Sequence, residues 1–176
     1  MTAGLAALRR VLPPPASPKV GCSEQRPWTR LERQLGLPFP PGYRDMVLTY
    51  GYGCIDRFLW VADPFRAGWF KWVALRMSAL IELRAVHHGR TVPYALFPEP
   101  GGLFPWAFTD NGDTLYWGNA GARALVVVGA GREPEWDEFH GGPCAFLAAL
   151  LGRTHVSPIF PGTFPEELSR FRSKRS

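Results

Sequence analysis

An Asn-Gly pair lies between two apolar segments of the chain and predicts a β-hairpin. Asn111-Gly112 separates Phe104–Thr109 from Thr114–Trp117. Asn-Gly favours the two-residue turns whose twist matches that of paired antiparallel strands, so we expect these two segments to be neighbours in a sheet. Ala124–Val128 follows closely, and its run of three valines predicts a further strand beside the hairpin. The chain is therefore expected to contain an antiparallel sheet.

Apolar residues recur at helical spacing in four other segments. Helices are predicted over 27–35, 43–50, 69–86 and 143–151, and another strand over 58–62. A glycine follows three of these helices, as is common at helix ends. Because the strands follow one another instead of alternating with helices, the order predicts an α+β fold with a single antiparallel β-sheet packed against several α-helices.

Prolines suggest a division of the chain into three parts. Pro13–Pro15 and Pro18 cannot continue a helix, so residues 1–26 are interpreted as a flexible, loosely attached leader with at most a short helix at its start. Residues 27–152 hold the predicted helices and strands and form the expected domain. Residues 153–176 contain three further prolines and are expected to be an irregular basic tail.

The net charge of +5 over 176 residues is concentrated at the two ends of the chain. Residues 1–33 carry six basic and two acidic residues, and residues 166–176 carry four basic and two acidic residues. Residues 34–165 carry ten basic and eleven acidic residues, which leaves −1. Binding of nucleic acid depends on cations that neutralise phosphates, so nucleic acid is not the expected partner of this domain. Binding through the basic ends is the alternative.

The sequence shows no recognised catalytic or cofactor pattern. Val126–Gly131 ends in Gly-x-Gly but lacks the third glycine and the following helix of a dinucleotide site. The acids of the hairpin have the wrong spacing for a calcium loop. His87 and His88, like the three cysteines, lack metal-ligand spacing. We therefore expect no enzymatic activity, no cofactor and no metal, and too few cysteines for a disulfide framework.

Acidic side chains cluster in two places and could face a basic partner. One cluster surrounds a tryptophan, a residue type enriched at binding hot spots. The alternative is a solvated connection whose tryptophan packs into the core. The candidate protein-binding residues are Asp110, Asp113, Glu133, Glu135, Trp136, Asp137 and Glu138.

A series of short motifs resembles the SUKH superfamily of SMI1/KNR4-like domains. The matching residues are Trp28, Leu31, Glu32, Leu35–Pro38, Tyr43, Tyr50–Gly53, Gly112–Trp117 and Phe146–Leu151. They follow the family order of a Trp-containing helix, a Leu-Pro link, a Tyr-Gly-x-Gly turn, a Gly-Asp strand and a closing helix. The resemblance covers about residues 27–152, and the two ends of the chain have no counterpart in the family motifs.

The resemblance implies an α+β fold without enzymatic activity. Bacterial members are mostly regarded as immunity proteins that bind and neutralise a cognate toxin, often a nuclease or deaminase. The abundance of Arg, Ala, Gly and Pro suits a GC-rich bacterium, so we expect a cytoplasmic immunity protein whose partner is a toxin domain, with no membrane association. The alternative, which follows the fungal members, is a regulatory or scaffolding interaction module without a toxin partner.

Overall fold

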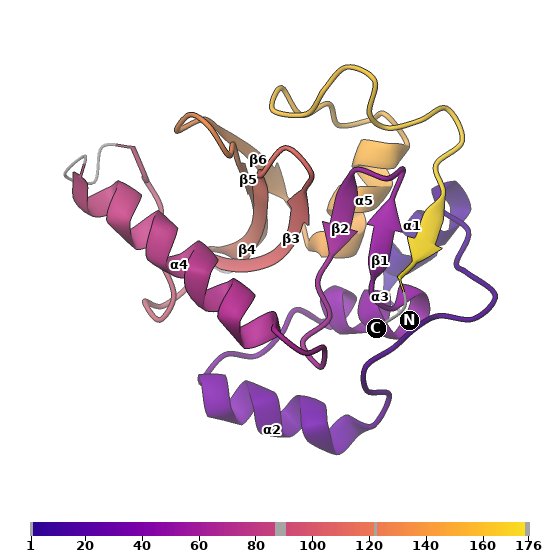
Figure 1. Cartoon of the computed structure of the whole chain (residues 1–176), viewed down its shortest axis with the longest axis horizontal. Coiled ribbons are helices and arrows are strands. Elements are labelled where there is room, and N and C mark those ends of the chain that lie inside the picture. The colour runs from indigo at the N-terminus through magenta and orange to yellow at the C-terminus, as the bar shows by residue number, and fades with distance from the viewer. Residues whose placement is uncertain (1, 87–90, 122, 175–176) are drawn as a thin grey trace.

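The computed structural model describes residues 2–86, 91–121 and 123–174. Within these ranges it contains five helices and one antiparallel sheet of seven strands (Figure 1). The helices are α1 (Ala3–Val11), α2 (Gln25–Leu35), α3 (Pro41–Tyr50), α4 (Trp69–Val86) and α5 (Pro143–Leu151). The strands are β1 (Gly53–Ile55), β2 (Leu59–Val61), β3 (Phe104–Thr109), β4 (Thr114–Ala120), β5 (Arg123–Gly129), β6 (Trp136–His140) and β7 (Phe171–Ser173). The expected α+β class is confirmed.

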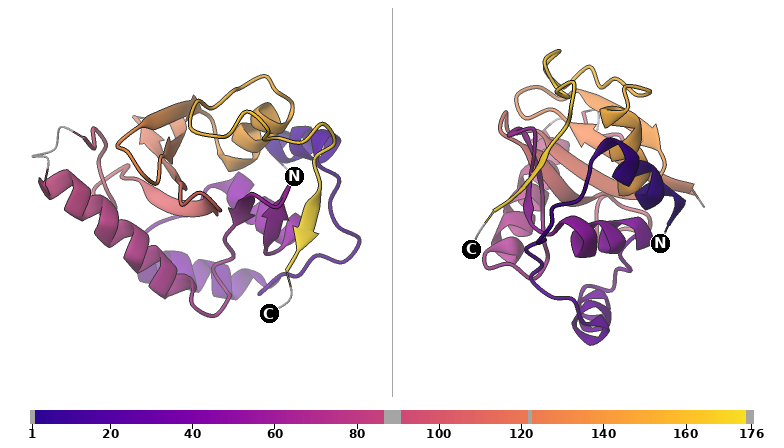
Figure 2. Two further views of the ribbon diagram at one scale, coloured as in Figure 1. Left: turned by 45° about the horizontal axis from the view of Figure 1, so that its top comes forward. Right: turned by 90° about the vertical axis from the view of Figure 1, so that its right-hand side faces the viewer.

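The strands lie in the order β6-β5-β4-β3-β2-β1-β7, so strands adjacent in sequence are adjacent in the sheet until β7 joins β1. Helix α4 runs along one face of the sheet, and α1, α3 and α5 gather on the other (Figures 1 and 2). We call these the α4 face and the α5 face. Trp72 of α4 contacts Phe108 on the first face, and Phe146 of α5 contacts Phe139 on the second.

One row of cross-strand neighbours spans the α4 face of the whole sheet. From β7 to β6 its members are Arg172, Cys54, Trp60, Phe108, Thr114, Gly129 and Trp136. Residues directly opposite one another on paired strands place their side chains on the same face. The row therefore runs across the sheet from the surroundings of Trp60 to those of Trp136.

The residues that carry the family resemblance hold the fold together. Trp28 is fully buried, and Glu32 accepts a hydrogen bond from the Phe39 N–H at 3.0 Å, which fixes the Leu-Pro link. The Tyr43 hydroxyl donates to the Ala62 carbonyl at 2.7 Å, and burial raises the pKa of Tyr43 well above its ordinary value. The first bond fixes α2 to the link, and the second joins α3 to the residue that follows β2.

The Tyr-Gly-x-Gly turn needs glycine because two other segments press against it. Gly51 has a φ of 72°, and a Cβ at this position would lie 2.4 Å from the Lys19 carbonyl oxygen. A Cβ on Gly53 would lie 2.4 Å from the Arg172 carbonyl oxygen. Side chains would therefore separate β1 from both ends of the chain.

Residues 1–26 differ from the flexible leader that the sequence suggested. Leu5, Leu8 and Leu12 are buried in the core, and α1 packs against α5. The Tyr50 hydroxyl donates to the Leu12 carbonyl at 2.6 Å. The prolines after Leu12 do end the helix, but they leave intact the apolar stripe formed by residues at i, i+3 and i+7. The stripe attaches this segment to the core.

The tail also includes an ordered element. Residues 153–170 run without a helix or strand, but Phe171–Ser173 form β7, which was not expected. Asp56 anchors the approach to β7 by accepting hydrogen bonds from the Ser169 hydroxyl at 2.9 Å and the Arg170 N–H at 2.7 Å. The pairing of β7 with β1 therefore begins directly after residues that Asp56 holds in place.

Candidate protein-binding site

The two acidic clusters meet at one end of the sheet. The β3–β4 turn and the β5–β6 turn lie side by side because their strands are consecutive neighbours. The Gly131 N–H donates to Asp113 Oδ1 at 3.0 Å, and a Cβ on Gly131 would lie 2.6 Å from the Gly112 carbonyl carbon. We call residues 110–113 and 130–138 the acidic rim. All seven candidate residues lie within it.

Both acids of the hairpin accept hydrogen bonds from other residues of the protein. Asp113 is only 5% exposed, and its Oδ2 accepts from the Thr109 hydroxyl at 2.6 Å. With the bond from Gly131, both of its carboxylate oxygens have donors. Asp113 therefore braces the rim and does not present a carboxylate to a partner. Asp110 is exposed, and its Oδ1 accepts from the Trp60 indole N–H at 2.7 Å.

Trp136 packs against the sheet instead of projecting from the rim. Its indole N–H donates to the Thr91 carbonyl at 2.7 Å, and its ring lies 5.3 Å from that of Tyr94. A Cβ on Gly129 would lie 2.7 Å from the Trp136 ring, so the glycine makes room for the indole. The last three residues of the acidic cluster, for which a solvated connection was the alternative, belong to the edge strand β6, Trp136–His140.

The remaining acids of β6 have partners on opposite faces of the sheet. Asp137 lies 2.9 Å from His155 Nε2, and these two side chains are only 11% and 19% exposed. Glu138 accepts a hydrogen bond from the Tyr94 hydroxyl at 2.7 Å. Burial, followed by this contact with Glu138, raises the pKa of Tyr94. Neither acid is a free surface charge.

Glu133 and Glu135 are the available charges of the rim. Both residues are exposed, and neither carboxylate has a hydrogen bond or ion pair with any residue in the described ranges. They border a depression of about 370 Å³ together with Asn111, Pro158 and Ile159. The turn itself is fixed by the Ala130 N–H, which donates to the Glu135 carbonyl at 3.0 Å. The rim can therefore offer two carboxylates without partners, carried on a turn whose backbone is hydrogen-bonded, to a cationic surface.

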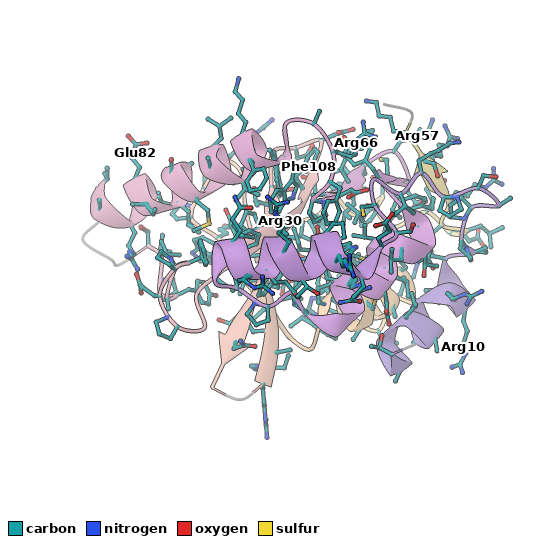
Figure 3. All side chains as sticks on the ribbon, turned by 90° about the horizontal axis from the view of Figure 1, so that it is seen from below. Arg10, Arg30, Arg57, Arg66, Glu82 and Phe108 are labelled. Atoms are coloured by element: carbon teal, nitrogen blue, oxygen red, sulfur yellow. The ribbon has the colours of Figure 1, made fainter. Side chains whose placement is uncertain are left out.

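A second region, missed by the sequence analysis, lies on the α4 face around Trp60. The Trp60 ring lies 5.9 Å from Tyr52 and 6.2 Å from Phe108, to which it is almost parallel. The Arg66 guanidinium lies 4.1 Å from the centre of the Tyr52 ring, and Lys174 Nζ lies 4.6 Å from that of Trp60. Figure 3 shows Arg66 and Phe108 on the same side of the molecule. The alternation of Leu59, Trp60 and Val61 was the available signal, since it places Trp60 opposite two buried residues.

The cysteines and histidines do not form a reactive centre within the ranges that the structure covers. Burial is the main cause that raises the pKa of both Cys54 and Cys144 to about 12, so both are protonated thiols at neutral pH. No three His, Cys, Asp or Glu side chains of this part of the chain could hold a metal ion, and His87 and His88 lie outside it. No helix there has the length and apolar character needed to cross a membrane.

Comparison of the chain with family models, with curated proteins and with solved structures gave no match.

Proposed function

We propose that this chain is a non-enzymatic protein-binding domain of the SMI1/KNR4-like (SUKH) type. It acts as a cytoplasmic bacterial immunity protein that neutralises a cognate toxin by direct binding. The observation that carries the proposal is the pair of exposed carboxylates, Glu133 and Glu135, which have no partner within the described chain. The toxin surface that fits them is basic, as is the substrate groove of a nuclease or of a nucleic-acid deaminase.

The rigidity of the rim supports this role. Asp113 joins the two turns, Trp136 is fixed to the Thr91 carbonyl, and Tyr94 holds Glu138. A surface that is already ordered loses little conformational entropy when it binds. Carboxylates exposed at the end of the sheet would also attract a cationic partner and speed the encounter. Covering a substrate groove requires nothing more than this shape and charge.

The proposal requires a toxin gene beside the gene for this chain, and the test uses the domain that this neighbouring gene encodes. The purified domain is titrated with the protein, and its activity and the formation of a complex are measured. We expect stoichiometric inhibition. Charge reversal by Glu135→Lys should weaken the complex by about tenfold or more, because it places a cation against a basic surface.

Glu24→Lys is the matched control. Glu24 is an exposed acid at the start of α2, and its reversal changes the net charge by the same amount. If toxin activity is unaffected and no complex forms at micromolar concentration, the immunity function is excluded. Equal weakening by both reversals would mean that net charge, and not the acidic rim, governs binding.

A further inference from the structure

A pocket of about 210 Å³ opens beside the aromatic residues of the α4 face. Tyr52, Trp72 and Phe108 contribute aromatic walls, Ala62 contributes an apolar surface, and Arg66 belongs to its lining. We call it the Arg66 pocket. Its size and its lining suit one apolar side chain, because an apolar group entering it would exchange water for aromatic and aliphatic carbon.

Arg66 is positioned to bind an anion beside that side chain. Its Cζ lies over the Tyr52 ring, 4.1 Å from the ring centre, and Arg66 has no ion pair with any acid of the described chain. Stacking uses the face of the guanidinium and leaves the N–H groups at its edge free for a bidentate contact with a carboxylate. The cation is therefore held by an aromatic ring and retains its donors.

The acid in the wall of the pocket, Asp63, attracts Arg66 electrostatically but forms no ion pair with it, and backbone donors bind its carboxylate. Asp63 is 1% exposed, and its two carboxylate oxygens accept from the Gly21 N–H at 2.7 Å and the Phe65 N–H at 3.0 Å. These bonds connect the N-terminal segment to the loop that carries Arg66. They also fix the backbone of this loop, so that the position of Arg66 is defined before a ligand arrives.

The charges around the pocket favour a carboxylate over a chain of phosphates. Asp110 is bonded to Trp60, and Asp63 lies in the pocket wall, so two anionic groups accompany Arg66 and Lys174. A polyphosphate backbone would meet these acids along with the cations. A peptide with one apolar residue beside one or two acids can place a single carboxylate at the guanidinium and carries fewer negative charges past these acids.

We propose that the Arg66 pocket is a docking site for an acidic segment of a partner protein. An apolar side chain of the segment fills the pocket, and a neighbouring carboxylate pairs with Arg66. This inference rests on the proposed function only in requiring a protein partner. It assigns to that partner a second contact, of opposite charge to the one at the acidic rim.

The test measures binding of two labelled peptides by fluorescence anisotropy, with the full-length protein. One probe is Gly-Glu-Phe-Glu-Gly, and the other replaces both Glu by Lys. We expect the acidic probe to bind at least about tenfold more tightly, and Arg66→Gln to remove this preference. Arg30→Gln is the matched control, because Arg30 is an exposed arginine of α2 outside the pocket, and it should change binding by less than about twofold.

Four results would overturn the proposal: no binding of the acidic probe, equal binding of the two probes, an unchanged affinity in Arg66→Gln, or tighter binding of an oligothymidine. Arg66→Lys keeps the charge but loses the planar fork, so it decides the question if Arg66→Gln fails to fold. Glu135→Lys should leave the acidic probe bound. A toxin complex that forms while the probe fails would refute the pocket alone, and a bound probe without a toxin complex would refute the immunity function alone.

Discussion

Four of the six acids of the acidic rim accept hydrogen bonds from or pair with other residues of the protein, whereas Arg66 in the Arg66 pocket lies over an aromatic ring and forms no ion pair in the described chain. The acidic rim contains more charged residues than the Arg66 pocket, but of its carboxylates only those of Glu133 and Glu135 have no hydrogen bond or ion pair within the described chain. The pocket has one cation that the sequence did not single out.

This contrast shows that the number of charges in a segment does not measure its capacity to bind. An acid in a turn or on an edge strand competes for the protein's own donors, and each bond formed there removes a lone pair from the surface. A cation held by an aromatic ring keeps its donors, because the ring interacts with the face of the guanidinium. The availability of a charge for binding therefore depends on its local geometry.

Cys54 is buried in β1 and should report how readily this part of the sheet opens to solvent. It lies between Trp60 and Arg172 on the α4 face, and burial is the first cause that raises its pKa from 9.0 to about 12. At pH 8 it should carry roughly a thousandfold less thiolate than an ordinary thiol, and its alkylation by iodoacetamide should be slower by a similar factor. Mass spectrometry of the labelled peptides would measure the rates. Alkylation of Cys54 as fast as that of the partly exposed Cys22 would mean that this face opens readily.

Asp113→Ala should destabilise the protein by about 2–3 kcal/mol in urea denaturation. The substitution leaves the Gly131 N–H and the enclosed Thr109 hydroxyl without their acceptor. Glu135→Ala, which removes an acid of the same rim that has no internal partner, is the control and should cost less than about 0.5 kcal/mol. Equal losses of stability in the two variants would contradict the distinction between an acid that is hydrogen-bonded within the rim and an acid that has no internal partner.

Tyr94→Phe should reduce stability by about 1 kcal/mol at neutral pH, because it removes one hydrogen bond to Glu138. The folded state raises the pKa of Tyr94 above 10.0, so the contribution of this residue is complete below pH 10 and declines as the pH rises through the folded-state pKa. The difference between the variant and the natural protein should therefore narrow above pH 10. Thermal denaturation at pH 7 and at pH 11 would test this, and a constant difference would contradict it.

The double substitution Glu133→Gln and Glu135→Gln should have the smallest effect on the fold, within about 0.5 kcal/mol. Its effect should instead appear in the association rate with a basic partner, which should fall and become less dependent on salt. Stopped-flow measurements at two ionic strengths would show this. If the salt dependence of the association rate is unchanged, the acidic rim is not part of the binding surface.

Much of the fold could be predicted because several elements carry strong local signals. Helical spacing identified α4 with its observed bounds, Trp69–Val86, and Asn-Gly identified the hairpin of β3 and β4. The missed elements had weak signals or contradictory ones. The three residues of β1 and of β7 are too few to show a period, and β6 contains two adjacent acids, which are uncommon in strands.

The candidate site was predictable in composition and not in arrangement. The sequence located all of the acids of the rim, and strand order then brought the two clusters together. Which acids stay available depends on partners distant in the sequence, such as Tyr94 for Glu138 and Gly131 for Asp113. The Arg66 pocket arises in the same way, since Tyr52, Trp72 and Phe108 come from three different parts of the chain.

The pairing of β7 with β1 has a consequence for folding during synthesis. The sheet from β1 to β6 consists of neighbours in sequence and can assemble as the ribosome releases it, but β1 acquires its outer partner only when Phe171–Ser173 emerge. Until then the nascent chain exposes an unpaired strand edge, which is a template for association with other chains. Chains truncated before β7 should therefore depend on chaperones more than the full chain does, although nearly all of the core precedes the truncation.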